Sequence, residues 1–226
     1  MYKAQTDIVS AVLIVAIALA LVSSAYMWGI PLIEKRQDTA LAERVDSSFN
    51  QENINSLPNT IEAIANSGGE KEFYIGANGL WMLNEAGNYI QFTFITKASK
   101  FATDTSYPIS LTPGVDCTSA SAPNGTLGLD KASIICVNAT RMGDKIQVTY
   151  RVWFRKLYED PFATNPKGYE ISLVKDLSGL LSSTEKTIVI SFDKTEPTTG
   201  PSGETLIKKK IKTASEVLGC SFQMEL

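Results

Sequence analysis

A long apolar segment lies close to the N-terminus of the chain. Residues 8–33 contain no charged side chain, and Glu34, Lys35 and Arg36 follow directly. An α-helix rises 1.5 Å per residue, so this segment would be about 39 Å long, which exceeds the roughly 30 Å hydrocarbon core of a bilayer. The pattern predicts that the protein is inserted in a membrane at some stage of its life.

The next residues predict an amphipathic continuation of this helix and then a second helical segment. Leu41, Val45 and Phe49 recur at every fourth position between charged residues, as in a helix that lays one face on a soluble domain. A second apolar set leads to Gly68 and Gly69, which are expected to end its helix. This set comprises Ile54, Leu57, Ile61 and Ile64, and Pro58 is expected to interrupt it.

Beyond Gly69 the apolar period changes to two, which indicates β-strands. The clearest strand covers residues 145–158, in which alternate residues from Ile146 to Phe154 share one face. Trp153 lies on the opposite face, where either a lateral contact or a second buried layer, such as the amphipathic helix, would explain it. Asn78 and Gly79 predict a tight hairpin between residues 72–76 and 80–83.

Further strands are expected between turn signals along the rest of the chain. About nine short strands, in roughly 190 residues after the apolar segment, predict an antiparallel β-sandwich in a single domain. The overall class is therefore α+β. The additional strands cover residues 89–96, 109–111, 133–137, 169–174, 187–192, 206–211 and 221–225.

Composition excludes several functions. The chain is 44% apolar and 20% charged with a net charge of −3, so nothing points to a nucleic-acid partner, for which a basic domain is typical. It contains no histidine, the commonest general base and metal ligand. We assign no catalytic, cofactor-binding or metal-binding residue and expect no enzyme; a membrane-tethered hydrolase ranks third among the functions considered.

The residues before the apolar segment do not form an ordinary signal peptide. A secretory signal peptide has an apolar stretch of about 7 to 15 residues followed by a cleavage site. Here the stretch is longer, and the junction suited to cleavage, Lys3-Ala4-Gln5, precedes it. This arrangement resembles the class III signal peptide of archaeal type IV pilin-like proteins, over roughly the first 35 residues. The resemblance implies cleavage between Ala4 and Gln5 by a prepilin peptidase on the cytoplasmic side.

The same resemblance implies a domain organisation and a filament. Residues 1–4 would be the leader, residues 5–49 a hydrophobic and then amphipathic helix, and residues 50–226 an extracellular head with an immunoglobulin-like fold. The mature helices would leave the membrane and pack as the filament core. Many pilins carry Glu at the fifth mature position, and this chain departs from that pattern with Val9.

Several residues of the helix are expected to serve packing. Small residues such as Ala16, Ala18, Ala20 and Ala25 allow helices to approach closely, although a plain anchor can also be rich in alanine. Asp7 is either a first-turn acid at the helix N-terminus or a charge partner for the freed amine of Gln5 on a neighbouring subunit. Gly29 and Pro31 are expected to kink or break the helix. The helix-packing residues are expected to be Ile8, Val12, Val15, Leu19 and Val22.

Three cysteines and two glycosylation sequons are relevant to an exported domain. Of the three pairings open to Cys117, Cys136 and Cys220, we expect Cys117 with Cys136; three reduced core thiols are the alternative. Asn124 and Asn138 each begin an Asn-x-Thr sequon, so both are candidate glycosylation sites.

A basic run, Lys208 to Lys210 with Lys212, is the remaining charge signal. We interpret these lysines as protecting a strand edge against wrong pairing; adhesion to a polyanionic surface is the alternative.

These features together predict a structural protein. The expected function is that of a subunit of an extracellular type IV pilus-like filament used for surface attachment, a helical homo-oligomer that depends on membrane assembly machinery and is membrane-inserted before assembly. The alternative is a single-pass anchored β-sandwich ectodomain, such as a minor pilin or an archaellum-associated protein, which binds a cell-envelope partner.

Overall fold

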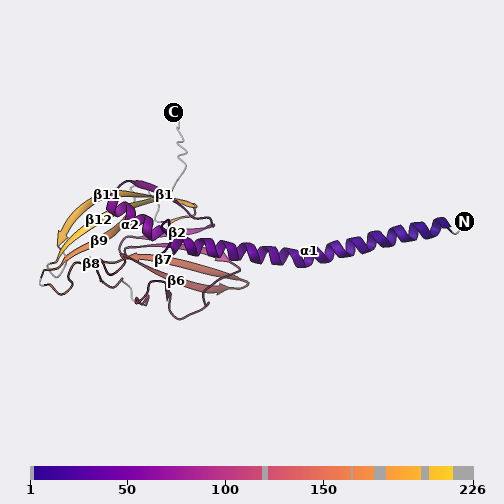
Figure 1. Cartoon of the computed structure of the whole chain (residues 1–226), viewed down its shortest axis with the longest axis horizontal. Helices are drawn as coiled ribbons and strands as arrows, with labels where there is room; N and C mark the ends of the chain where they lie inside the picture. Colours follow the sequence, from indigo (N-terminus) through magenta and orange to yellow (C-terminus); the bar gives the residue numbers. More distant parts are fainter. Residues whose placement is uncertain (1–2, 119–121, 164, 176–181, 200–203, 216–226) are drawn as a thin grey trace, which may run out of the picture. The chain divides into compact units, whose positions relative to one another are not determined.

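The computed structural model describes residues 3–118, 122–163, 165–175, 182–199 and 204–215 of the chain. It consists of two units, Met1–Ala40 and Leu41–Leu226. The helix α1 (Lys3–Phe49) provides all of the described residues of the first unit and the first nine residues of the second (Figure 1). Each unit is described here by itself.

The first unit is a helix that is apolar as far as Ile33, and none of its described side chains, from Ser10 to Ala40, is buried. Residues 10–28 are all exposed. The helix continues through Gly29 and Pro31, so it does not break at these residues, and a kink there stays a prediction. Proline removes only one backbone hydrogen bond from a helix, and the remaining bonds on both sides of Pro31 keep the chain helical.

The second helix of the head begins where the sequence suggested an interruption. α2 (Leu57–Ser67) has Ser56 at its N-cap and Pro58 in its first turn, where a backbone N–H would have no helical partner. Pro58 therefore starts this helix instead of interrupting it. Ile54 precedes the helix and is exposed, in contrast to Leu57, Ile61 and Ile64, which are buried.

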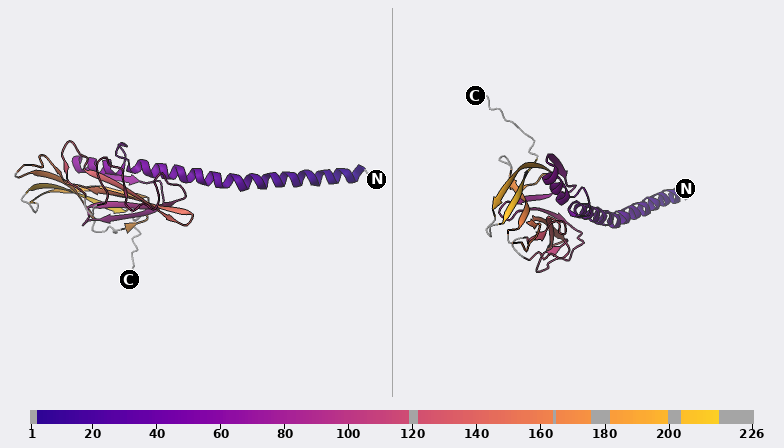
Figure 2. Two further views of the ribbon diagram at one scale, coloured as in Figure 1. Left: turned by 90° about the horizontal axis from the view of Figure 1, so that it is seen from below. Right: turned by 60° about the vertical axis from the view of Figure 1, so that its left-hand side comes forward.

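The remaining elements form two six-stranded sheets (Figures 1 and 2). In the first sheet the order is β1 (Glu70–Tyr74), β11 (Thr187–Thr199), β12 (Thr205–Ser215), β9 (Lys167–Lys175), β8 (Leu157–Tyr158) and β5 (Gly125–Thr126). In the second sheet it is β10 (Ser182–Ser183), β2 (Gly79–Asn84), β3 (Tyr89–Thr96), β7 (Lys145–Phe154), β6 (Ser133–Met142) and β4 (Ile109–Ser110).

The expectation of purely antiparallel sheets is wrong for the first sheet. β12 pairs in parallel with β9, and β5 pairs in parallel with β8. The chain leaves β9 for β10 in the second sheet, returns through β11, and turns back into β12 between β11 and β9. Because β12 fills this position, it runs in the direction of β9, and the sheet is mixed.

The hairpin expected at Asn78 and Gly79 does not form. β1 pairs with β11 and β2 pairs with β3 and β10, so the two strands belong to different sheets. Ile75 and Ala77 in the connection are buried, and burial between the sheets outweighs the local turn preference. The hairpin lies one strand later, between β2 and β3, where Asn88 has a φ of 51°.

One hydrophobic core is shared by both sheets and the helical segments of the second unit. Alternate residues of β7, including Val148, Tyr150 and Val152, point into it, as the sequence predicted. Phe49 at the end of α1 stacks on Tyr150 with ring centroids 4.6 Å apart. The last turns of α1 are therefore part of the folded head.

Candidate functional site: the apolar helix and the surface of the head

The first candidate site is the exposed apolar helix. The candidate membrane span covers Ser10–Phe49. The most apolar stretch of this span has a mean hydropathy of 2.2, and no residue of that stretch is buried. By length and composition this helix could cross a membrane, although a signal sequence near an N-terminus can pass the same criterion. The expected packing residues Val12, Val15, Leu19 and Val22 are all exposed.

Two aromatic residues near the end of the apolar segment were missed by the sequence analysis. Tyr26 and Trp28 are both exposed. The rise from Ile8 to Trp28 is about 30 Å, the thickness of a hydrocarbon core, and Tyr and Trp favour the boundary between hydrocarbon and water. An aromatic pair just before a charged segment was the signal that could have identified this boundary.

The residues of the expected cleavage site lie at the described start of the helix. Ala4, Gln5, Asp7 and Ile8 are helical in their backbone, and the structure describes no side chain before Ser10. Cleavage after Ala4, a charge partner for Asp7 and packing of Ile8 therefore stay predictions.

The structure contains a disulfide bond between Cys117 and Cys136, the pairing expected from the sequence. The Cα atoms of the two residues are 6.0 Å apart. Both cysteines are buried in a small cluster with Ile134 and Trp153. A loop that carries Cys117 therefore covers Trp153, whereas the amphipathic helix does not. Because Trp153 is buried in this way, its side chain cannot make a lateral contact with another molecule. Cys220 lies outside the described residues.

The two sequons differ in their accessibility. Asn124 is exposed immediately before β5. Asn138 is half-buried inside β6, opposite Thr149 of β7. Oligosaccharide transfer requires an accessible amide nitrogen, so the structure favours Asn124 over Asn138.

The prediction that the basic run on β12 protects a strand edge is wrong. β12 is paired on both sides, with β11 and with β9. Its lysines form ion pairs: Lys208 with Glu170, Lys210 with Glu196, and Lys212 with Asp193, at 3.4, 2.7 and 2.9 Å.

These ion pairs also change the electrostatics of the strand. Hydrogen bonds from Lys194 and then from Lys210 lower the pKa of Glu196 to about 2. The carboxylates neutralise much of the positive charge that a polyanionic surface would need, which weakens the alternative of adhesion through this run.

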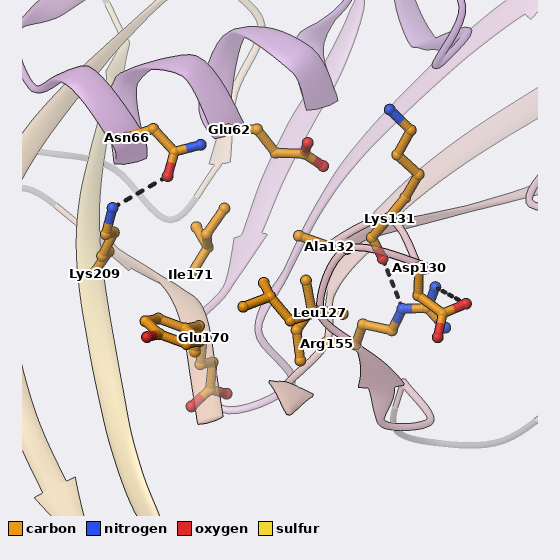
Figure 3. A pocket seen from close by; sticks show the side chains of 13 residues that line it. Glu62, Asn66, Leu127, Asp130, Lys131, Ala132, Arg155, Glu170, Ile171 and Lys209 are labelled. Atoms are coloured by element: carbon orange, nitrogen blue, oxygen red, sulfur yellow. Dashed lines mark hydrogen bonds and ion pairs between the residues drawn. The ribbon is translucent and has the colours of Figure 1, made fainter. Parts of the chain in front are cut away.

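A cavity of about 330 Å³ lies beside α2, β9 and β12 (Figure 3). Two polar side chains on its α2 side have partners in the sheets. Glu62 accepts a hydrogen bond from the Ser133 hydroxyl at 2.8 Å, and Asn66 accepts one from Lys209 at 3.1 Å. Such contacts join the helix to the sheets.

The wall of the cavity opposite α2 is held by a buried arginine. Arg155 donates a hydrogen bond to the Lys131 carbonyl oxygen at 2.7 Å and lies 3.3 Å from the Asp130 carboxylate. The described residues contain no group of three or more acidic or cysteine ligands suited to a metal ion. The expectation that the chain is not an enzyme stays a prediction, because no observation of the structure tests it.

Comparison with known proteins adds no relative. No protein-family model, no curated protein and no solved structure matches this chain.

Proposed function

We propose that this chain is a structural subunit of an extracellular, type IV pilus-like filament that is assembled by packing of the N-terminal helices and used for surface attachment. One observation carries the proposal: residues 10–28 form an apolar helix surface that is exposed throughout and that no other described residue buries. Such a surface must be covered by lipid or by other apolar helices. In this proposal lipid covers it in the precursor and neighbouring copies cover it in the filament.

Small residues along the helix support packing between copies. Ala16, Ala18 and Ala20 are exposed and leave room for close helix approach. Gly29 is half-buried, but a Cβ atom placed on it would meet no atom within 4 Å. Without such residues, lipid would compete more effectively with a neighbouring helix for the same surface.

The head supports an extracellular location. Disulfide bonds persist in oxidising compartments, and the bond between Cys117 and Cys136 is buried within the fold. In this proposal the two sheets correspond to an immunoglobulin-like head, which forms the outside of the filament. Asn124 would carry a glycan there, and loops of the head would make the attachment contacts.

A precursor with a short leader completes the proposal. A prepilin peptidase would cut between Ala4 and Gln5, and membrane assembly machinery would extract the mature helix. Asp7 would then lie near the freed amine of Gln5 on a neighbouring copy.

The second candidate is a single-pass anchored ectodomain that binds a cell-envelope partner, as a minor pilin or an archaellum-associated protein would. The aromatic pair favours it, because Tyr26 and Trp28 end a segment of about 30 Å that fits one bilayer. A permanent anchor needs this length but does not need a packing surface.

Bulky apolar substitutions separate the two candidates. Ala18→Phe keeps the segment apolar and membrane-inserted but fills the space that a neighbouring helix would occupy, so we expect filaments in electron micrographs to be lost while the protein stays in the membrane fraction. Leu13→Phe is the matched control at a position that is already large, and it should retain filaments. N-terminal sequencing of wild-type filaments should begin at Gln5.

The anchor is supported instead if the wild-type chain retains Met1, extracts into detergent as a monomer and forms no filament. Equal filament yields from the Ala18→Phe and Leu13→Phe variants would also contradict packing through the small residues.

A further inference from the structure

A small polar pocket lies on the outer face of the second sheet, on the side away from the core. On this face Gln91 of β3 is paired with Arg151 of β7, and Thr149 of β7 is paired with Asn138 of β6. These four side chains are among the residues that line a cavity of about 230 Å³. We call this cavity the Arg151 pocket.

Arg151 is half-buried, and no ion pair in the described part of the chain includes it. The nearby Arg155, by contrast, lies 3.3 Å from the carboxylate of Asp130. Removing a charge from water is costly unless an opposite charge or hydrogen bonds compensate for it. Arg151 is therefore the group in this pocket that an anionic ligand would complete.

Three neighbours hold the guanidinium group of Arg151 in place. Its Nε and Nη2 atoms donate hydrogen bonds of 3.3 and 3.0 Å to Oε1 of Gln91. Its Cζ atom lies 4.5 Å from the ring centroid of Tyr89 and 5.3 Å from that of Trp153. A second edge of the group, formed by Nη1 and the other hydrogen of Nη2, has no acceptor among the described residues. Such an edge matches the two oxygens of a carboxylate.

Groups that can bind hydroxyls lie beside Arg151 on the same face. Asn138 is half-buried, and its side-chain amide has no hydrogen-bond partner in the part of the chain that the structure describes. Asn138 and Arg151 are diagonal neighbours on adjacent strands. The hydroxyl group of Thr149 shares one hydrogen bond of 3.0 Å with Thr93 and can take part in more. The pocket thus combines a site for one carboxylate with amide and hydroxyl groups for uncharged oxygens.

The size of the pocket limits the ligand. Its volume of about 230 Å³ lies below the range of about 300–1,000 Å³ that is typical of sites for drug-sized ligands. A single ring with its substituents matches this volume, whereas a longer chain does not fit inside. Compounds that carry a carboxylate and several hydroxyl groups on one ring are sugar acids.

We propose that the Arg151 pocket binds a sugar acid, with its carboxylate on the free edge of Arg151 and its hydroxyl groups on Asn138 and Thr149. An acidic sugar at the end of a polysaccharide presents the same chemistry, because the rest of its chain lies outside the pocket. The site lies entirely in the head, so the inference does not depend on filament formation.

Saturation-transfer NMR tests the binding with the full chain, in a detergent that has no sugar or carboxylate in its headgroup. Glucuronate and glucose are the probes, because they differ only in a carboxylate in place of a hydroxymethyl group. Glucuronate should bind at least about ten-fold more tightly, since it adds a charge-assisted contact with Arg151.

Methyl glucuronide distinguishes the two sources of the ligand. Its methyl group occupies the position at which a longer saccharide is linked. An affinity equal to that of glucuronate would identify a chain end as a ligand, and a weaker affinity would identify the free sugar acid. Either result supports the proposal.

Two variants and a control assign the binding to the pocket. Arg151→Gln should weaken glucuronate binding by at least about ten-fold and leave glucose binding unchanged. Asn138→Asp keeps Arg151 and the size of the side chain but places a carboxylate beside the guanidinium, so it should also weaken glucuronate binding. Arg141→Gln is the matched control, because Arg141 is exposed near the end of β6 and does not line the pocket. It should bind glucuronate as the wild type does.

Four results would overturn the proposal. Equal affinities for glucuronate and glucose would remove the role of the carboxylate. Equal losses in Arg151→Gln and Arg141→Gln would indicate attraction by overall charge. Displacement of glucuronate by an equal concentration of acetate would show that the hydroxyl groups are not recognised. Absence of saturation transfer to both glucuronate and its epimer galacturonate would leave the pocket without this ligand.

Discussion

The hydroxyl group of Tyr150 donates a hydrogen bond of 3.1 Å to Oδ1 of Asp46. Tyr150 belongs to the central strand β7, and Asp46 belongs to the last turns of α1, 104 residues earlier in the chain. Asp46 also forms an ion pair of 3.1 Å with Lys100. These contacts join the end of the long helix to the core of the head at a partly buried position.

The burial of Tyr150 beside Asp46 makes stability sensitive to alkaline pH. Burial, followed by the nearby Asp46 carboxylate, raises the pKa of Tyr150 above its ordinary value of 10. Above pH 10 the unfolded chain therefore loses this proton before the folded chain does, and stability decreases as pH rises. The slope from this group should be about half of 1.4 kcal/mol per pH unit at pH 10 and approach that full value near pH 11, measured by urea unfolding between pH 9.5 and 11.

Tyr150→Phe is the matched variant for that measurement. It should cost about 1.5–3 kcal/mol at pH 7, because a hydrogen bond to a carboxylate is lost. It should also have a shallower decrease above pH 10 than the wild type. Parallel pH profiles for both proteins would show that Tyr150 ionises freely in the folded state.

Phe49 should be one of the most sensitive positions of the head. It is fully buried and lies against Tyr150, Trp81 and Phe92. Phe49→Ala should lower the free energy of unfolding by about 3–5 kcal/mol, because it leaves a cavity among these rings. Ile54→Ala, at an exposed position five residues later, should change it by less than about 0.5 kcal/mol. Chemical denaturation in detergent measures both, and similar losses would contradict the packing of Phe49.

The disulfide bond should stabilise the head mainly by restricting the unfolded chain. Its cysteines are 19 residues apart, and closing a loop of this size contributes about 3 kcal/mol in the chain-entropy model. The double variant Cys117→Ser, Cys136→Ser should lose about this amount. Cys220→Ser should keep the wild-type melting temperature under non-reducing conditions, and an equal loss in this variant would show that the pairing involves Cys220.

Glycosylation should distinguish the two sequons. If the native host modifies the protein, a glycan mass should be found on the peptide that contains Asn124, because this side chain is exposed. Asn124→Gln should remove this mass, and Asn138→Gln should leave it unchanged. A glycan on Asn138 alone would mean that modification precedes the pairing of β6 with β7.

Local patterns predicted several elements well. The apolar segment, the amphipathic turns ending at Phe49 and the alternation of β7 each follow from the period of a single helix or strand, so the sequence alone indicates them. It also indicates a membrane-compatible length, the absence of histidine and the positions of cysteines and sequons. None of these depends on which distant segments pair.

The tertiary structure decided which strands pair with each other and which side chains form ion pairs. Asn78 and Gly79 favour a hairpin locally. However, β1 and β2 belong to different sheets, because Ile75 and Ala77 in the connection between them are buried. From the sequence alone, the lysines of β12 look like residues that protect a strand edge. In the structure β9 pairs with β12, so these lysines are ion-paired residues of a central strand. Strand order and burial arise from contacts between residues far apart in sequence. The periodicity of one segment does not specify which distant segments it will contact.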